Sequence, residues 1–416
     1  MNFPNRLLFW LLLPCCITIA GEPDIETDAP VLPEEKPWLT PSVNIRTRYE
    51  FRSVDPFEDS QALTTRLRGG LLTREVFGLS AFGELEATTA IVDDYRSNPA
   101  DASTDPHVPN NTVIGDPENF ELNQAWLQYH QDAILLRVGR QRIIRNNAAF
   151  VAHVGWRQNE QTYDAVNLEY DKGPLRASYA YSNRALRVFG DDANDAPPGA
   201  PLLDFDGDFH FLDILYEEEP LTVGTYLYSL DVENSNPVGE SHSLGGFVKA
   251  GPWRAELAYQ FGESSLVLDR DYGAFYGHLT FTQTIGDSEL ITGVEYLQEN
   301  FKTPFALLHA FNGFADVFVM QRAGLNDAGG AYQGLTDTYL GYVRKGLPYD
   351  LTFKGYGHVF MDDQVGDVYG YEADAVLEKA FTKNIKGILT GAYFVSEGES
   401  GFPDTTQVTA ELNFSF

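Results

Sequence analysis

Cysteine is almost absent from this sequence, and so are long apolar runs. The 416 residues contain two cysteines, Cys15 and Cys16, both near the N-terminus. A secreted chain that loses this segment keeps no cysteine and does not rely on disulfides. After the N-terminal segment, no run reaches the roughly 18 apolar residues that a membrane-spanning helix needs. We therefore expect neither a disulfide framework nor a transmembrane helix.

Basic residues are also scarce. The chain has 29 Lys and Arg against 60 Asp and Glu, which gives a formal net charge of −31. Binding to nucleic acid requires a basic surface, so we expect no nucleic-acid partner. Aromatic residues make up 13 % of the chain and glycine occurs 37 times, a mixture that favours strands and tight turns.

The first twenty residues have the pattern of a secretory signal peptide. Arg6 supplies the positive charge, Leu7 to Leu13 form the apolar stretch, and Thr18-Ile19-Ala20 provide a small-x-small cleavage signal. The alternative, a lipoprotein signal that ends at one of the two cysteines, fits less well because Leu-Leu-Pro precedes Cys15. Residues 21–42 are acidic and rich in proline, and we expect a flexible periplasmic leader there.

Residues 43–416 consist of short segments in which apolar and polar residues alternate. In "VNIRTRYEFR" (43–52), one face carries Val43, Ile45 and Phe51, and the opposite face carries three arginines. Alternation with a period of two is typical of a β-strand with two different faces. The pattern predicts eighteen strands and no helices, with the strands at 43–54, 61–73, 76–91, 120–131, 133–144, 161–170, 175–187, 209–217, 221–231, 242–250, 253–262, 272–283, 288–299, 337–345, 349–360, 369–379, 386–396 and 405–416.

The connections between these strands alternate in length. Short turns such as "DKGP" (171–174) and "AGP" (250–252) separate pairs of strands, and the long connections are 92–119, 145–160, 188–208 and 300–336. An even number of strands with short turns at one end and long loops at the other predicts an all-β, transmembrane antiparallel barrel of the outer membrane. A soluble β-sandwich is the alternative, but it would have to bury every apolar face on a second sheet.

This barrel prediction fixes several expected partners. Apolar faces would contact outer-membrane lipid and lipopolysaccharide, with short turns in the periplasm and long loops outside the cell. The last strand, "QVTAELNFSF", alternates and ends in Phe416, which resembles the signal that the barrel assembly machinery reads. Acidic loop residues such as those of "DFDGD" (204–208) do not match the spacing of a calcium loop, so we expect solvated loops and no metal site.

Arginine is unevenly distributed. Fifteen of the twenty arginines lie between Arg46 and Arg187. A charge on the lipid face near the middle of the bilayer costs roughly 2–4 kcal/mol, so strand arginines should face the lumen. They could pair with Glu50, Glu84, Glu86 or Glu121 and brace the barrel, or stay available for a ligand. Because a guanidinium holds carboxylates bidentately, a lumenal cluster predicts passage of anions.

The segment "VGRQRIIRNNAAFVAHVGWRQNEQTYDAV" (138–166) resembles the signature of the alginate-export porin family of Gram-negative outer membranes. "TPFALLHAFNGFADVF" (303–318) resembles the family's second block, and "RTRYEFR" (46–52) and "TTRLRGGL" (64–71) fit its first two strands. The resemblance implies an eighteen-stranded monomeric barrel with an arginine-lined constriction that passes a polyuronate. The connection 300–336 would be a constriction if it folds inward and a surface loop if it does not.

Candidate pore-lining residues follow from the strand pattern and from this resemblance. The arginines would attract an anionic polysaccharide or carboxylate solute, and the amides would donate hydrogen bonds to sugar hydroxyls. The candidates are Arg46, Arg48, Arg66, Arg68, Arg137, Arg140, Arg142, Arg157, Gln141, Gln158 and Asn159.

The sequence contains no motif of an enzyme. Its eight histidines are scattered, and neither a phosphate-binding loop nor a nucleophile elbow is present. We therefore expect no enzymatic activity and no cofactor. The predicted function is an outer-membrane channel for diffusion or export of anionic solutes such as an alginate-like polyuronate, with periplasmic export partners. The alternatives are a general or small-carboxylate porin, or a non-conducting adhesin or structural barrel.

Overall fold

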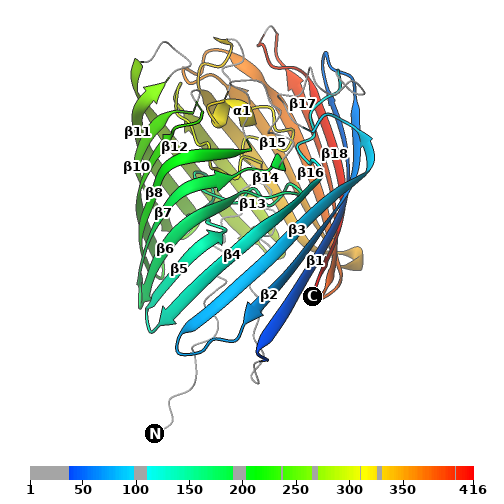
Figure 1. Ribbon diagram of the computed structural model, residues 1–416. Helices are drawn as coiled ribbons and strands as arrows, with labels where there is room; N and C mark the ends of the chain where they lie inside the picture. Colours follow the sequence, from blue (N-terminus) through cyan, green and yellow to red (C-terminus); the bar gives the residue numbers. More distant parts are fainter. Residues whose placement is uncertain are drawn as a thin grey trace.

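The protein forms a closed barrel of eighteen antiparallel strands (Figure 1). The computed structural model describes residues 37–97, 110–190, 203–235, 238–264, 270–309, 311–325, 330–398 and 400–416. The predicted signal peptide and most of the predicted leader lie outside these residues. Strand β1 (Leu39–Val54) pairs with both β2 and β18, which closes the barrel. The predicted all-β barrel of eighteen strands is confirmed.

Each strand is hydrogen-bonded to its neighbours in the sequence, so the order around the barrel is the order of the chain. The remaining strands are β2 (Ser60–Thr73), β3 (Leu79–Asp94), β4 (Asn119–Gln131), β5 (Ile134–Gln141), β6 (Thr162–Lys172), β7 (Leu175–Leu186), β8 (Asp204–Glu218), β9 (Leu221–Val232), β10 (Glu240–Ala250), β11 (Trp253–Ser264), β12 (Arg270–Ile285), β13 (Ser288–Leu297), β14 (Leu335–Leu347), β15 (Leu351–Met361), β16 (Val368–Thr382), β17 (Ile385–Ser396) and β18 (Thr405–Ser415).

The described residues include two short helices, whereas the sequence pattern predicted none. They are α1 (Val319–Arg322) and the 3-10 turn η3 (Pro348–Asp350). A strand pattern does not reveal such single turns, because they occupy less than the window over which a helical period can be read. No helix among the described residues has the length and hydropathy needed to cross a bilayer.

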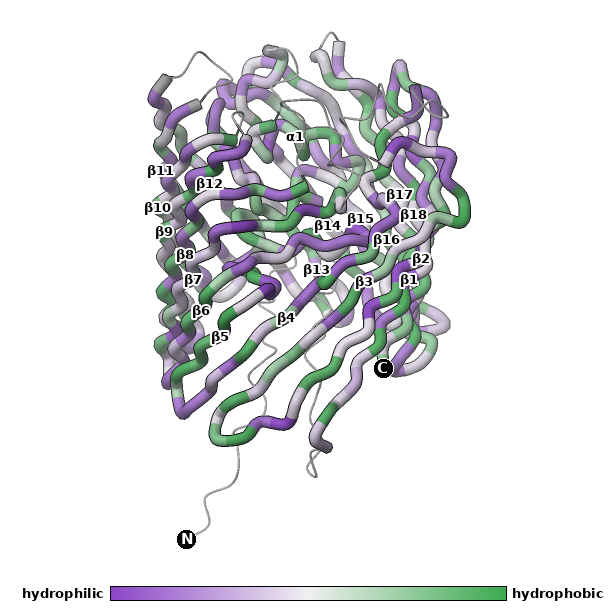
Figure 2. Tube along the Cα trace, viewed as in Figure 1, coloured by the Kyte–Doolittle hydropathy of each residue, from purple (hydrophilic) through white to green (hydrophobic). Residues whose placement is uncertain are grey.

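Hydrophilic and hydrophobic residues alternate along the strands (Figure 2), and this alternation gives the barrel two different surfaces. Large apolar side chains face outward; Leu127 and Leu257, for example, are 66 % and 73 % exposed. Polar and charged side chains of the same strands face inward, where Arg48 is 2 % exposed and Glu50 is 1 % exposed. An apolar outer band and a polar interior are what a bilayer requires of a barrel wall. The apolar face of the 43–52 segment, which carries Val43, Ile45 and Phe51, is therefore directed toward lipid.

The connections sort to opposite ends of the barrel. Short turns, such as those at Gly173 and Gly251, form one end, which we call the turn end, and the longer connections form the loop end. Gly173 and Gly251 have φ angles of 62° and 56°, which glycine adopts without the strain of a side chain. The C-terminus also lies at the turn end, where Phe416 N donates to Val43 O over 2.9 Å.

Among the described residues of the loop end, the connections 142–161 and 298–325 fold into the lumen, and Asp116 of the connection after β3 also reaches the interior, where its Oδ2 lies 3.8 Å from Arg48 Nη1. The connections 142–161 and 298–325 contact each other, since Ala152 N donates to Phe305 O over 2.7 Å. Phe305 is fully buried, and its ring centroid lies 4.9 Å from that of Phe209 and 5.7 Å from that of Phe205, both on the inner face of β8. The connection predicted at 300–336 therefore folds inward over the residues that the structure describes.

An aromatic core fills the lumen on the side of β8 to β14. Phe150 packs against Tyr226 and Tyr276 with centroid distances of 5.1 Å each. The α1 segment is fixed to the wall because Arg322 Nη1 lies 2.9 Å from Glu295 Oε2 and donates to Asn312 Oδ1 over 2.7 Å. Burial of apolar rings inside the barrel thus anchors the two inward connections to one half of the wall.

Candidate solute pathway

Two cavities lie in the other half of the lumen. The turn-side cavity has a volume of about 350 Å³ and is bordered by β1, β2, β16, β17 and β18 down to the turn at residues 383–384. The loop-side cavity has a volume of about 290 Å³ and is bordered by the top of β1 and by the connections at 112–115, 187–189 and 304–325. Together they follow the seam where β1 meets β18.

Trp156 lies between the two cavities and lines both. Its indole stacks on His309 with a centroid distance of 4.0 Å, and His309 stacks in turn on Phe314 at 5.0 Å. The indole Nε1 donates to Leu307 O over 3.1 Å. Trp156 therefore joins the two inward connections and forms the partition between the cavities. Nothing in the strand pattern indicates this role, because it depends on how two loops meet.

Basic side chains outnumber carboxylates in both cavities. In the turn-side cavity, seven basic residues face three carboxylates, and in the loop-side cavity four arginines face one carboxylate. The basic residues are Arg46, Arg48, Arg68, Arg142, Lys354, Lys383 and Lys386 on the turn side, and Arg52, Arg96, Arg157 and Arg187 on the loop side. The lining carboxylates are Glu160, Glu378, Glu411 and Asp316.

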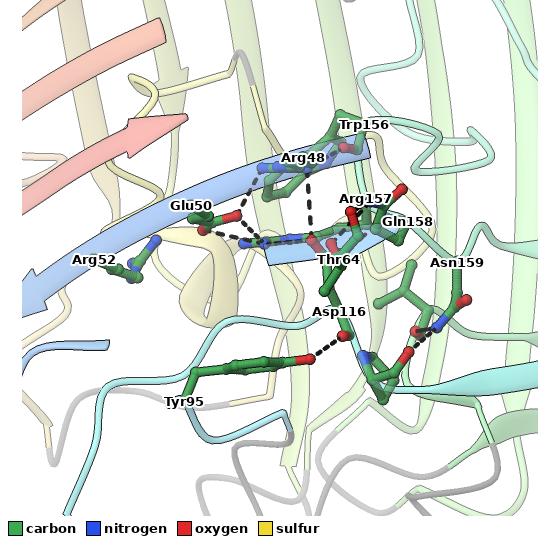
Figure 3. Close-up of polar contacts among 12 residues, drawn as sticks. Arg48, Glu50, Arg52, Thr64, Tyr95, Asp116, Trp156, Arg157, Gln158 and Asn159 are labelled. Atoms are coloured by element: carbon green, nitrogen blue, oxygen red, sulfur yellow. Dashed lines mark hydrogen bonds and ion pairs between the residues drawn. The ribbon is translucent and has the colours of Figure 1, made fainter. Parts of the chain in front are cut away.

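Glu50 and Asp116 hold the arginines around the partition (Figure 3). Glu50 Oε2 lies 2.8 Å from Arg48 Nη2 and 3.0 Å from Arg157 Nη1. Burial alone would raise the pKa of the Asp116 carboxyl, but Arg48 and Arg157 outweigh it and hold that pKa below its ordinary value. The Arg157 guanidinium lies 4.0 Å from the Trp156 centroid. This network fixes two guanidinium groups against the indole.

A second network braces the wall below the partition. Arg68 contacts Glu86 through Nε, and its Nη2 lies 3.2 Å from Glu160 Oε2. Arg142 contacts Glu160 and lies 3.1 Å from Glu84 Oε1. The expected pairing with Glu50, Glu84 and Glu86 is therefore present, and it extends to Asp116 and Glu160, which the sequence did not single out. Charged pairs in this setting fix geometry as well as charge.

The structure divides the predicted pore-lining residues into three groups. Arg46, Arg48, Arg68 and Arg142 line the turn-side cavity and Arg157 lines the loop-side cavity. Arg66, Arg137, Gln141, Gln158 and Asn159 do not line these two cavities. Arg140 forms the third group.

Arg140 lies on the outer face, contrary to the prediction. In β5 it has the same parity as Leu136 and Val138, both of which are exposed. Its Nε donates to Asp164 Oδ1 over 2.8 Å, and Asp164 has the parity of the exposed Val166. The resemblance placed Arg140, Arg142 and Arg157 in the pore, whereas strand alternation applied to Arg140 would have assigned it to the outside. A paired charge near the end of a strand avoids the cost of the bilayer centre.

The predicted amide donors are engaged within the protein. Gln158 Nε2 donates to Thr64 Oγ1 over 2.8 Å, and its Oε1 accepts from Arg46 Nε over 3.0 Å. Asn159 Oδ1 accepts from Thr88 Oγ1 over 2.8 Å, and Gln141 Nε2 donates to Ala165 O over 3.0 Å. Gln158 and Asn159 tie the inward connection 142–161 to the wall, and Gln141 joins β5 to β6.

Several lining residues were missed. Arg52 has the same strand parity as Arg46 and Arg48, so alternation could have found it. Lys354 and Lys386 lie on inner faces of β15 and β17 and share Glu378, with N–O distances of 2.6 and 3.4 Å. The prediction did not include them because it considered arginines as the only basic residues of the pore. Arg187 was expected at the end of the strand 175–187, but β7 ends at Leu186 after a register shift between Ser182 and Arg184, so alternation does not decide its face.

Comparison with known proteins shows that this barrel has the fold of outer-membrane porins. Residues 37–187 match the model of the alginate export family. The resemblance read from 138–166, 46–52 and 64–71 is confirmed over this region, while the block at 303–318 lies outside it. No curated protein sequence matches the chain.

Solved structures share the fold at low sequence identity. Acinetobacter baumannii OccAB4 aligns with a TM-score of 0.65 at 14 % identity, over 92 % of this chain and 99 % of that one. Pseudomonas aeruginosa OpdL aligns with a TM-score of 0.61 at 14 % identity, over 91 % and 98 %. Pseudomonas aeruginosa OpdK, solved with vanillate, aligns with a TM-score of 0.62 at 12 % identity, over 90 % and 98 %. The chain has the fold of outer-membrane porins and resides in the outer membrane of a Gram-negative bacterium.

Proposed function

We propose that this protein is an outer-membrane channel for small anionic solutes, carboxylates in particular. The observation that supports this proposal most directly is the excess of basic side chains in both lumenal cavities. Selectivity follows the potential at the narrowest part of a pore, and guanidinium groups bind carboxylates with two parallel hydrogen bonds. The structural likeness to OpdK, solved with the carboxylate vanillate, supports the same class of solute.

Export of an alginate-like polyuronate is the second candidate. It is favoured by the match to the alginate export family and by the turn-side cavity, where Trp156, His309 and Phe314 offer ring faces beside seven basic residues. A polymer needs one continuous bore, however, and Trp156 separates the two cavities. A polyuronate channel therefore requires the Trp156–His309 contact to open, whereas a small solute requires only a local displacement.

Liposome swelling distinguishes these functions. We expect vesicles that contain the protein to admit a small monocarboxylate faster than a neutral solute of equal size. If the channel exports a polyuronate, uronate oligomers added to the turn end should block it more strongly than neutral oligosaccharides do. Equal uptake of charged and neutral solutes would contradict both candidates. Absence of any uptake would favour a non-conducting barrel.

A further inference from the structure

Arg187 differs from the other arginines beside the partition. Arg48 and Arg157 share Glu50, and Arg52 and Arg157 lie 3.9 and 3.8 Å from Asp316 Oδ2. Within the described ranges, no carboxylate contacts the guanidinium of Arg187, and its Nη1 is buried without a hydrogen-bond partner. The side chain is only 7 % exposed. A buried cation without an anion is costly, and the wall of a ligand cavity is one place where a ligand can offset that cost.

The surroundings of Arg187 are apolar. Its guanidinium carbon lies 4.5 Å from the Phe205 ring centroid and 5.1 Å from that of Phe189. Burial lowers the pKa of the Arg187 guanidinium to about 10, so it stays charged at neutral pH. Ring faces stabilise the cation partly but offer no hydrogen-bond acceptor to the buried Nη1.

The loop-side cavity continues this apolar wall. Phe189, Met320 and Leu325 line it, together with Val154, Leu308 and Val317. By contrast, the turn-side cavity is lined by hydroxyl and amide groups such as Thr390, Thr409 and Asn413. A hydroxylated sugar acid would lose hydrogen bonds to water in the loop-side cavity, whereas a hydrocarbon body would gain from burial there.

We propose that the loop-side cavity is a binding site for monocarboxylates with an apolar body, with Arg187 holding the carboxylate and Phe189 and Met320 contacting the body. The site rests on the proposed anion-channel function and narrows its substrate class. In this arrangement the cavity selects solutes by their hydrocarbon part, and the turn-side cavity passes them on by charge. Uronates are disfavoured at this site.

Cyclohexanecarboxylate and glucuronate form a matched pair of probes, because each has one carboxylate on a six-membered ring and only the second ring carries hydroxyls. Each is added to the loop end of single channels in a planar bilayer, and the concentration that halves the current is measured. We expect the half-blocking concentration of cyclohexanecarboxylate to be at least tenfold lower than that of glucuronate. Cyclohexylmethanol, which lacks the charge, should be inactive. Glucuronate acting equally well or better would overturn the proposal.

Variants test the residue that holds the carboxylate. Arg187→Gln should raise the half-blocking concentration of cyclohexanecarboxylate about tenfold, that is about 1.4 kcal/mol, and leave that of glucuronate unchanged. Arg187→Lys should restore part of the effect. Arg176→Gln, at the turn end and 3.3 Å from Asp171, is the matched control with no effect. Gly115→Val, at a position that lines the cavity beside Phe189, should obstruct the site without removing charge and so weaken block by cyclohexanecarboxylate.

The outcomes separate this proposal from the function on which it rests. Unchanged block in Arg187→Gln, with the barrel shown to be folded by its heat-modifiable migration on gels, would overturn the site. The sign of the zero-current potential of the wild-type channel is recorded in the same bilayers. Cation selectivity with intact, Arg187-dependent block would overturn the anion channel and retain the binding site.

Discussion

The two halves of the lumen are built from the same alternating strands but differ in what the inward connections leave open. On the β8 to β14 side, rings such as Phe305 and Tyr276 fill the interior and anchor the connections. On the β1 and β18 side, charged networks around Glu50 and Glu160 line two cavities. Lumenal orientation alone therefore does not define a pathway. Arg66, for example, is buried inside the barrel but lines neither cavity.

Replacement of Trp156 by alanine should produce the largest change, because it removes the residue that lines both cavities. We expect single-channel conductance to rise roughly severalfold, because the narrowest part of the pore limits the current and Trp156 forms that part. Trp126→Ala is the control, since Trp126 stacks on Arg137 and borders neither cavity. Equal conductance of wild type and Trp156→Ala would show that ions cross the barrel elsewhere.

Replacement of Phe305 by alanine breaks the comparison from the aromatic side. A buried Phe→Ala change lowers stability by about 3–5 kcal/mol, and here the lost contacts are those that hold the inward connections. We expect frequent transitions to higher conductance and a lower temperature for conversion of the folded band on gels. Phe275→Ala, on the lipid face and 58 % exposed, should show neither effect. If Phe305→Ala channels show no more transitions than the wild type, the aromatic core does not control the pathway.

Arg142 and Arg140 sharpen the comparison, because they are two residues apart and lie on opposite sides of the wall. Arg142→Gln removes a charge from the turn-side cavity and leaves Glu84 and Glu160 less compensated. The anion-to-cation permeability ratio should fall roughly twofold, following the potential in the pore. Arg140→Gln should leave the ratio unchanged. A shift of equal size in both variants would contradict the assignment of Arg140 to the outer face.

Lys302 should produce the smallest effect. Burial lowers its pKa to about 8 from an ordinary value of 10.5, and the connection 298–325 carries it. The unfolded connection therefore binds more protons between pH 8 and pH 10.5, so the folded connection gains stability as pH rises through that window. Channel flicker in the wild type should decrease from pH 8 to pH 10. In Lys302→Met it should be low and constant; a wild-type dependence that persists there would assign the effect to another group.

Alternation and connection length were sufficient to predict the barrel, its eighteen strands and its two ends. β1 begins at Leu39 instead of residue 43, and β5 ends at Gln141 instead of residue 144, because the rims of the barrel carry weaker alternation. Arg46, Arg48 and Arg68 were found because their strand parity decides their face. Trp156 and Arg187 could not be found, since their positions arise from contacts between segments far apart in the chain. The sequence prediction gave the Gln158 amide a role in binding solute, whereas in the structure this amide bonds to Thr64 and Arg46.

The zero-current potential of the wild-type channel under a potassium chloride gradient tests the central claim most directly. Acidic groups on the outer loops are screened over roughly 8–10 Å in physiological salt, so the basic excess within the cavities should set the sign. We predict a potential of the sign that chloride selectivity gives, despite a net charge of −31 for the chain. A potential of the opposite sign would show that Glu50, Asp116, Glu160 and their neighbours neutralise the lining arginines, and would contradict an anion pathway.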